Sequence, residues 1–317
     1  MGRISYGVFL PFYAFSAEGK VESHFEVVRD VVLECERLGF DSVYLDDHLM
    51  WGNKPVLECW TVLSALSAVT SKIRLGTMVV CASFRNPALL AKMAATFDVV
   101  SNGRLELGLG AGVQEDEHAA YGVSFPKPSV RIERLEEAVI ILKKMWTEEK
   151  ATFMGEHYRV NSAVCEPKPM QKPHPPIIIG GGGEKMMMKV QAQYADRVEW
   201  GYLPTLELYE HKLQVLQEQC RIVGRDFKEI QMSAWLGGQI FIAENQNELN
   251  AKLGKWKPRD VTVDTFKAAN FICTPEECAW KIREYASLGV TQFMVFFGDF
   301  PQLGGLRVFA KHVLHNT

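Results

Sequence analysis

The chain has 317 residues, of which 47% are hydrophobic and 23% are charged, and its formal net charge is −3. These proportions are typical of a folded globular protein and exclude a disordered chain, a collagen and a long coiled coil. The near balance of 35 basic and 38 acidic residues argues against nucleic acid or an anionic membrane as the main partner.

Short β-rich runs alternate with longer segments of helical period along the whole sequence. The predicted strands, in chain order, are Ile4–Leu10, Ser42–Leu45, Ile73–Val80, Leu105–Leu109, Ile177–Ile179, Arg197–Trp200, one strand within Ile230–Ile242, and Gln292–Phe297. The predicted helices that follow them are Glu22–Leu38, Leu57–Thr70, Pro87–Val100, Val130–Met145, Lys185–Tyr194, Leu206–Val223, Pro275–Leu288 and Leu303–Leu314.

This alternation predicts a parallel sheet, because a crossover must carry the chain back before the next strand can lie alongside the last. Eight units favour closure into an α/β fold of the (β/α)8 TIM barrel type, which leaves no sheet edge exposed. An open, doubly wound sheet is the alternative. No low-complexity linker divides the units, so we predict a single domain over residues 1–317.

Two stretches, at about residues 151–172 and 247–270, interrupt the alternation. In the first, Ala151–Val164 is compatible with a small hairpin, and a run of prolines after it forbids regular structure. The second, Asn247–Asn270, is polar and poorly periodic. Because irregular segments of a barrel often cover its active face, we expect both insertions at the C-terminal face, where they would cap the mouth and set specificity.

The seven cysteines are scattered, and their spacing does not match a zinc site. We interpret them as reduced thiols of a cytoplasmic protein, because disulfides are rare in that compartment. The N-terminus lacks the basic-then-apolar pattern of a secretion signal, and no apolar run approaches the roughly 20 residues of a membrane span. The sequence therefore predicts no membrane partner.

A barrel carries its active site at the carboxyl ends of its strands, and Tyr44-Leu45-Asp46-Asp47-His48 stands at the end of the second predicted strand. A histidine beside a carboxylate is suited to acid–base catalysis, although a histidine bonded to a loop carbonyl fits the same pattern. A metal-dependent hydrolase needs several convergent histidines, whereas this chain has 8 histidines and no His-x-His pair. We predict no metal site.

Glycines gather at the ends of two further strands. Gly180–Gly183 lead from a strand into a helix, where free peptide N–H groups and the helix N-terminus suit an anion such as phosphate. This is not a P-loop, and Lys185 occupies the last glycine position of the dinucleotide-binding motif, although Glu199 keeps such a site open as an alternative. Gly108, Gly110 and Gly112 allow a planar ligand or a neighbouring loop to approach the backbone closely.

Taken in order, these motifs resemble the luciferase-like monooxygenase superfamily, and in particular its coenzyme F420-dependent branch. The resemblance covers nearly the whole chain, and its specificity lies in the ordered set because no single piece is specific. The matching segments are Gly7–Pro11, Gly39–Val43, Asp47–Leu49, Glu58–Trp60, Ile73–Thr77, Arg85–Pro87, Ser101–Arg104, Leu107–Gly112, Glu117–His118, Tyr121–Gly122, Pro175–Gly181 and Ala195–Asp196.

The resemblance implies a (β/α)8 barrel that binds a flavin or deazaflavin at the carboxyl ends of its strands, acts on a small-molecule substrate and forms a homodimer. It implies that Asp47 and His48 lie beside the reactive ring, with His48 as the proton donor or acceptor. It also implies a non-prolyl cis peptide near Met78-Val79. The implied cofactor-binding residues are Asp47, Met78, Val79, Cys81, Ala111 and Gly112, together with Gly181, Gly182 and Gly183 at the phosphate.

The function that this resemblance implies is hydride transfer between coenzyme F420 and a small organic substrate. An FMN-dependent monooxygenase that uses O2 and NAD(P)H-reduced flavin is the alternative on the same barrel, and a non-catalytic flavin-binding relative is a third interpretation. The sequence departs from the branch at one point, since sugar-phosphate dehydrogenases carry a glutamate directly after the Gly-x-Gly of the fourth strand. Here Ala111–Val113 follow Gly110, and the nearest acids are Glu115–Glu117. This argues against glucose-6-phosphate as substrate and leaves the second acid–base residue unassigned.

Overall fold

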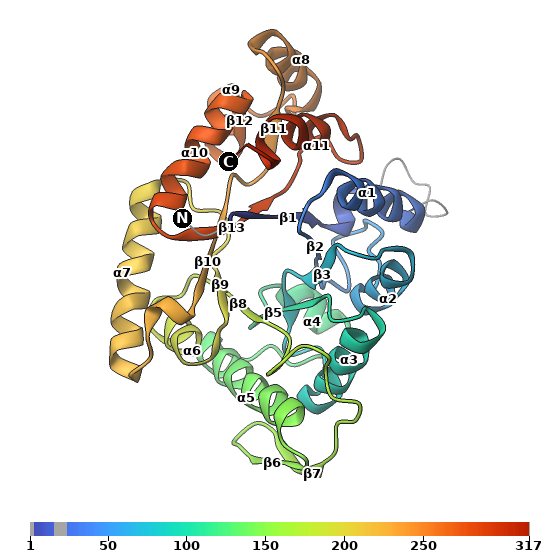
Figure 1. The fold of residues 1–317 in the computed structure, drawn as a ribbon, viewed down its shortest axis with the longest axis vertical. Helices are drawn as coiled ribbons and strands as arrows, with labels where there is room; N and C mark the ends of the chain where they lie inside the picture. The colour runs from blue at the N-terminus through green and yellow to red at the C-terminus, as the bar shows by residue number, and fades with distance from the viewer. Residues whose placement is uncertain (1–2, 16–23, 317) are drawn as a thin grey trace.

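The computed structural model describes residues 3–15 and 24–316 of the chain. Strands and helices alternate around one ring, with the helices on the outside (Figure 1). The barrel strands are β1 (Ser5–Leu10), β2 (Ser42–Leu45), β3 (Arg74–Thr77), β5 (Leu105–Gly110), β8 (Ile177–Gly180), β9 (Arg197–Glu199), β10 (Gln231–Trp235) and β13 (Val290–Val295). The helices that follow them are α1 (His24–Leu38), α2 (Cys59–Val69), α3 (Pro87–Val100), α5 (Pro128–Thr147), α6 (Met186–Tyr194), α7 (Leu206–Val223), α10 (Pro275–Ser287) and α11 (Gly304–Phe309).

The eight strands form a closed parallel barrel. Each strand pairs with its neighbour in the order β3-β2-β1-β13-β10-β9-β8-β5, and hydrogen bonds between β3 and β5 close the ring. The predicted TIM barrel is therefore confirmed, and the open sheet is excluded. The predicted start of the first helix at Glu22 lies outside the described residues, and the last predicted helix is α11 continued by a π-helical turn, η4 (Ala310–Leu314).

Local sequence signals set where several helices begin. The Glu58 carboxylate accepts the N–H groups of Trp60 and Thr61 at the start of α2, and Asn86 does the same for α3, whose first residue is Pro87. Such caps satisfy N–H groups that have no partner within the helix. At these positions the chain turns from a strand end into the next helix.

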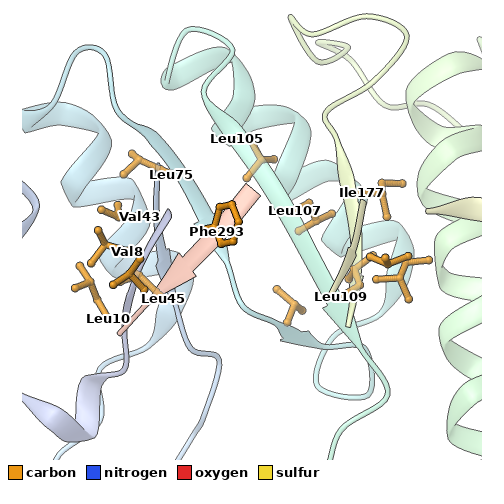
Figure 2. Close-up of a cluster of buried hydrophobic side chains, with 14 of the residues drawn as sticks. Val8, Leu10, Val43, Leu45, Leu75, Leu105, Leu107, Leu109, Ile177 and Phe293 are labelled. Atoms are coloured by element: carbon orange, nitrogen blue, oxygen red, sulfur yellow. The ribbon is translucent and has the colours of Figure 1, made fainter. Parts of the chain in front are cut away.

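Buried side chains alternate between the two faces of the strands, as the period of a β-strand requires. Val8, Val43, Leu75 and Leu105 are register neighbours on four successive strands and belong to the large core that includes the helices (Figure 2). Tyr44, between Val43 and Leu45, belongs to a smaller cluster with Met78, Ile178 and Met294. The barrel therefore has a packed interior as well as a packed outer layer.

A charged network occupies the amino-terminal half of the barrel interior. Glu106, the second residue of β5, lies 2.5 Å from Arg197 and 2.5 Å from Arg74, and the Tyr44 hydroxyl also donates to it. Burial acts to raise the pKa of Glu106, but the two arginines outweigh it and lower that pKa to about 2. The charge of Glu106 is thus paired with two arginines, as a buried charge requires. The network lies between the carboxyl-terminal half of the interior and the amino-terminal face.

The third strand is interrupted where the site begins. After β3 the chain leaves the ladder at Met78 and Val79, whose peptide bond is cis as the resemblance implies, and it pairs with β5 again as β4 (Val80–Cys81). Val79 enters the barrel between two glycines. A Cβ on Gly110 would lie 2.6 Å from one Val79 methyl, and a Cβ on Gly180 would lie 3.0 Å from the other. These glycines therefore leave room for Val79.

The first irregular segment does not lie where we expected. It contains the predicted hairpin, formed by β6 (Ala151–Met154) and β7 (Arg159–Ala163). The carboxylate of Glu137, in the middle of α5, accepts N–H groups of the hairpin turn, and Gln171 donates to the Leu105 carbonyl at the amino end of β5. Residues 151–172 thus run along α5 and return to the amino-terminal face, because the chain must reach the start of β8.

The second irregular segment does follow the carboxyl end of a strand, β10. It contains two helices that were not predicted, α8 (Gln246–Trp256) and α9 (Val263–Ala269), between the paired strands β11 (Ile240–Ile242) and β12 (Phe271–Cys273). Each helix buries one side chain, Leu249 and Phe266 respectively. A helix with a single buried residue shows no periodic pattern of hydrophobic residues in its sequence. The sequence signal of these two helices is the N-cap residue of each, Asn245 and Thr262.

In the described part of the chain, no helix combines the length and apolar character that a membrane span requires.

Replacement of Gly110 by alanine tests the role of Val79. Gly110→Ala is expected to lower the free energy of unfolding by about 1–3 kcal/mol, because the new methyl would overpack against Val79. In a Val79→Ala background, Gly110→Ala should lower the free energy of unfolding by less, and the difference should be about 1 kcal/mol or more. Urea unfolding of the four proteins measures this coupling.

The control is Gly254→Ala in α8, where a new methyl would meet no atom within 4 Å. This substitution should change the free energy of unfolding by no more than about 1 kcal/mol. If Gly110→Ala lowers the free energy of unfolding equally in wild type and in Val79→Ala, then Val79 does not fill the space next to Gly110.

Candidate active site

A cavity of about 490 Å³ opens among the carboxyl ends of the barrel strands. This volume lies within the usual range of sites for small molecules and cofactors. Its described lining combines backbone of the glycine-rich strand ends, aromatic side chains and acidic groups, with a single arginine. The acidic lining residues are Asp46, Asp47, Glu117 and Glu199, the arginine is Arg131, and the aromatic residues are Phe9, Tyr13, Trp200 and Trp235.

The structure brings nearly all of the predicted site residues to this cavity, although they come from four different strands. The exception is Gly182, whose carbonyl oxygen accepts a hydrogen bond from Lys212 and which does not line the cavity. The predicted residues in the lining are Asp47, His48, Met78, Val79, Cys81, Ala111, Gly112, Gly181 and Gly183.

His48 is held by an acid that the sequence left unassigned. Its Nδ1 lies 3.1 Å from Oε1 of Glu117, whose Oε2 accepts the Leu49 N–H at 3.0 Å. Glu117 is 3% exposed. A carboxylate can only accept hydrogen bonds, so Nδ1 carries the proton. The other ring nitrogen, Nε2, has no hydrogen-bond partner among residues 3–15 and 24–316, and it is the one left for proton exchange.

Glu117 belongs to a helix that sequence reasoning missed. This helix, α4 (Glu115–Ala120), has six residues and no side-chain cap, so it shows neither a helical period nor a cap signal. The available signal was its charge, since the first turn holds three acids, which favour the positive end of a helix. The partner of Glu117, 69 residues earlier in the chain, could not be read from local sequence.

Both carboxylate oxygens of Asp47 accept hydrogen bonds from other protein groups. Arg85 binds both of its oxygens, at 2.7 and 2.9 Å, and the Cys81 N–H donates to it at 3.1 Å. Burial raises the pKa of Asp47, and Arg85 acts in the opposite direction. These bonds tie the loop after β2 to the end of β4 and to the segment that follows it. This geometry suits the positioning of the third strand better than proton transfer.

Cys81 lines the cavity and contacts the buried His118 of α4 behind it. Its Sγ lies 3.5 Å from Nε2 of His118, whose Nδ1 bonds to the Gln114 carbonyl at 2.6 Å. Burial raises the pKa of Cys81 to about 11, so the thiol is neutral near pH 7. Gly112 passes over this pair with φ +81°, and a Cβ there would lie 2.8 Å from Sγ. Glycine is therefore required at this position.

Two further acids of the lining differ in the number of hydrogen-bond partners of their carboxylate oxygens. Glu199 accepts hydrogen bonds from Ser233 and from the Gly201 N–H, so both of its oxygens are used within the barrel. Asp46 accepts the Phe12 N–H at 2.9 Å through Oδ1, whereas its buried Oδ2 has no hydrogen-bond partner. Burial raises the pKa of Asp46 from 3.8 to about 6. Burial thus disfavours the charged form of this carboxyl relative to that of an exposed aspartate.

Among the described residues, no group of three or more His, Cys, Asp and Glu side chains is arranged to hold a metal ion.

The family model of luciferase-like monooxygenases matches residues 4–260 of the chain. An F420-dependent glucose-6-phosphate dehydrogenase of Microbacterium testaceum is 37% identical over 88% of this chain and 90% of its own. One of Segniliparus rotundus is 32% identical over 89% and 91%. The chain belongs to the luciferase-like monooxygenase family.

Comparison of folds agrees with this assignment. An F420-dependent secondary alcohol dehydrogenase, solved in complex with an F420–acetone adduct, superposes with a TM-score of 0.79 over 98% of both chains at 22% identity. At that identity the likeness concerns the fold.

The raised pKa of Asp46 predicts a pH-dependent effect of Asp46→Asn on stability. Below about pH 4 Asp46 is neutral in both folded and unfolded protein. Between pH 4 and pH 6 the unfolded chain loses this proton first, so wild type loses stability that the uncharged variant keeps. The free energy of unfolding of the variant minus that of wild type should therefore be about 1–3 kcal/mol larger at pH 8 than at pH 4. Urea unfolding at both pH values measures the gain, and a pH-independent difference would contradict it.

Proposed function

We propose that the protein is a coenzyme F420-dependent oxidoreductase that transfers a hydride between the deazaflavin and a small, uncharged organic substrate. The observation that carries this proposal is the His48–Glu117 pair at a cavity whose lining also includes the glycine loop. The two relatives at 32 and 37% identity, which match about nine tenths of the chain, are named as F420-dependent enzymes and support F420 as the cofactor.

The residues present fit such a cofactor. Backbone of Gly110, Ala111 and Gly180 lines the cavity beside Val79, so a flat ring system meets little side-chain bulk there. Val79, Met78 and Ala111 would support the ring. The loop at Gly181–Gly183, which leads into α6, would hold the phosphate through peptide N–H groups.

When bound, the deazaflavin supplies a carbon in its central ring that accepts or delivers hydride. His48 moves the accompanying proton at Nε2, taking it from a substrate hydroxyl in one direction and returning it to a carbonyl oxygen in the other. Glu117 fixes the ring orientation through Nδ1 and stabilises the imidazolium that forms. Asp47 holds the end of β4 through the Cys81 N–H, so we assign it a positioning role.

The cavity favours an uncharged substrate over a sugar phosphate. Four acids line it, and its one described cation, Arg131, stacks on Phe125 at 3.8 Å and donates to the Pro126 carbonyl. Part of the wall is aromatic, with Phe9 and Trp235 in edge-to-face contact at 5.2 Å. Small alcohols and ketones match this lining, and efficient turnover of glucose-6-phosphate would contradict the assignment.

Replacement of His48 and its partner tests the mechanism. His48→Ala should lower kcat by about 10²–10⁴-fold with little change in F420 affinity, because a general acid–base acts in the transition state. Glu117→Gln should lower kcat by about 10–100-fold, because it removes the charge that orients and stabilises the imidazole. Steady-state kinetics and F420 titration measure both effects.

The matched control is Glu115→Gln, which removes the same charge from an exposed position of the same helix and should leave kcat nearly unchanged. An unchanged kcat in His48→Ala would reject the role of this histidine.

We further propose a cytoplasmic homodimer. All seven cysteines are free and buried, which supports a reducing compartment and can be checked by cell fractionation. One face of α3 carries Leu89, Met93, Thr96 and Val100 at helical spacing, and Leu89 and Val100 are 56 and 64% exposed. The last three of these line a groove together with Trp60 of α2. An exposed apolar stripe of this kind marks an interface.

Val100→Lys should therefore shift the protein from dimer to monomer in sedimentation equilibrium, because burial of a lysine in the interface is unfavourable. Val263→Lys, at an exposed position of α9, is the control and should leave the dimer intact. A monomeric wild type, or a dimer insensitive to Val100→Lys, would contradict this interface.

A further inference from the structure

The glycine loop is held from behind by two side chains outside the cavity lining. Gln191 of α6 donates to the carbonyl oxygens of Ile179 and Gly181, at 3.0 and 2.9 Å. Lys212 of α7 donates to the carbonyl oxygen of Gly182 at 2.7 Å. Three carbonyl groups at the end of β8 are thus turned towards the surrounding helices.

Lys212 is itself fixed in place. Its Nζ lies 2.7 Å from Oε1 of Glu184, which also bonds to Nε2 of His211 at 3.1 Å. The side chain of Lys212 is 15% exposed, whereas that of Glu184 is 40% exposed. The ammonium group therefore has two oxygen partners, one from the loop and one from the residue that follows the loop.

The direction of these bonds determines what the loop presents to the cavity. In a planar trans peptide the C=O of one residue and the N–H of the next point in opposite directions. Because the Gly182 carbonyl faces Lys212, the N–H of Gly183 is directed away from α7. Gly183 lines the cavity, whereas Gly182 does not. The bond from Lys212 thus fixes the orientation of an N–H donor in a residue that lines the cavity.

We propose that Lys212 is a positioning residue for the phosphate of the cofactor, acting through the Gly182–Gly183 peptide. This inference rests on the proposed function. Gln191 also holds carbonyl groups of the loop. However, it is fully buried and accepts the indole N–H of Trp200, so it belongs to the core. Lys212 is therefore the residue whose removal tests the loop without opening a cavity in the core.

The experiment compares two probes that differ in the group the loop would hold. One is F420, and the other is the ribityl deazaflavin that lacks the phosphate and everything beyond it. Lys212→Met should weaken F420 binding by about tenfold or more, because a charge-assisted hydrogen bond that orders the loop is lost. It should change the Kd of the phosphate-free compound less than about twofold. Fluorescence titration of the purified protein measures both Kd values without turnover.

The matched control is Lys189→Met, which removes the same charge from an exposed position of α6 and should leave both Kd values near those of wild type. Equal weakening of both probes by Lys212→Met would show that Lys212 only supports the fold, and equal effects of the two variants would show a general attraction of charge. No effect on F420 binding would also overturn the proposal.

Failure of the proposed function gives a different result. If wild type binds FMN and does not bind F420, the F420 assignment falls, and the same variants are compared with FMN and riboflavin. A wild type that binds the phosphate-free compound as tightly as the complete cofactor would contradict the role of Lys212 in either case.

Discussion

The hydrogen bonds between β3 and β5 close the ring of strands, and the site depends on that closure. Because all eight strands are parallel, the closed ring brings every carboxyl end to one rim. His48 follows β2, α4 follows β5 and the glycine loop follows β8, so only a closed ring brings them to one cavity. The paired charges around Glu106 fill the opposite half of the interior.

Within that rim, several side chains hold other groups of the protein in place. Helix α4 holds two sides of the cavity, since Glu117 bonds to His48 and the next residue, His118, contacts Cys81. Asp47 and its arginine fix the strand beside Val79. The acidic residue next to the histidine in sequence therefore bonds to Arg85 and to the backbone of Cys81, and the acid that bonds to His48 comes from a different strand end.

The order of the eight β-then-α units was predictable because each unit carries its own hydrophobic period and caps. The residues around the cavity were predictable because they follow strand ends in the order of a known family. The partners of His48 and Asp47 were not, since Glu117 and Arg85 lie 69 and 38 residues further along the chain. The path of residues 151–172 depends on contacts with α5 and with the amino end of β5, which no local pattern reveals.

Equilibrium titration of the purified protein with F420 and with FMN tests the central claim most directly, because the claim is that this rim binds a deazaflavin. The account predicts saturable binding of F420 with one site per chain and weaker binding of FMN. Absence of F420 binding, or tight FMN binding accompanied by NAD(P)H-dependent O2 uptake, would contradict it.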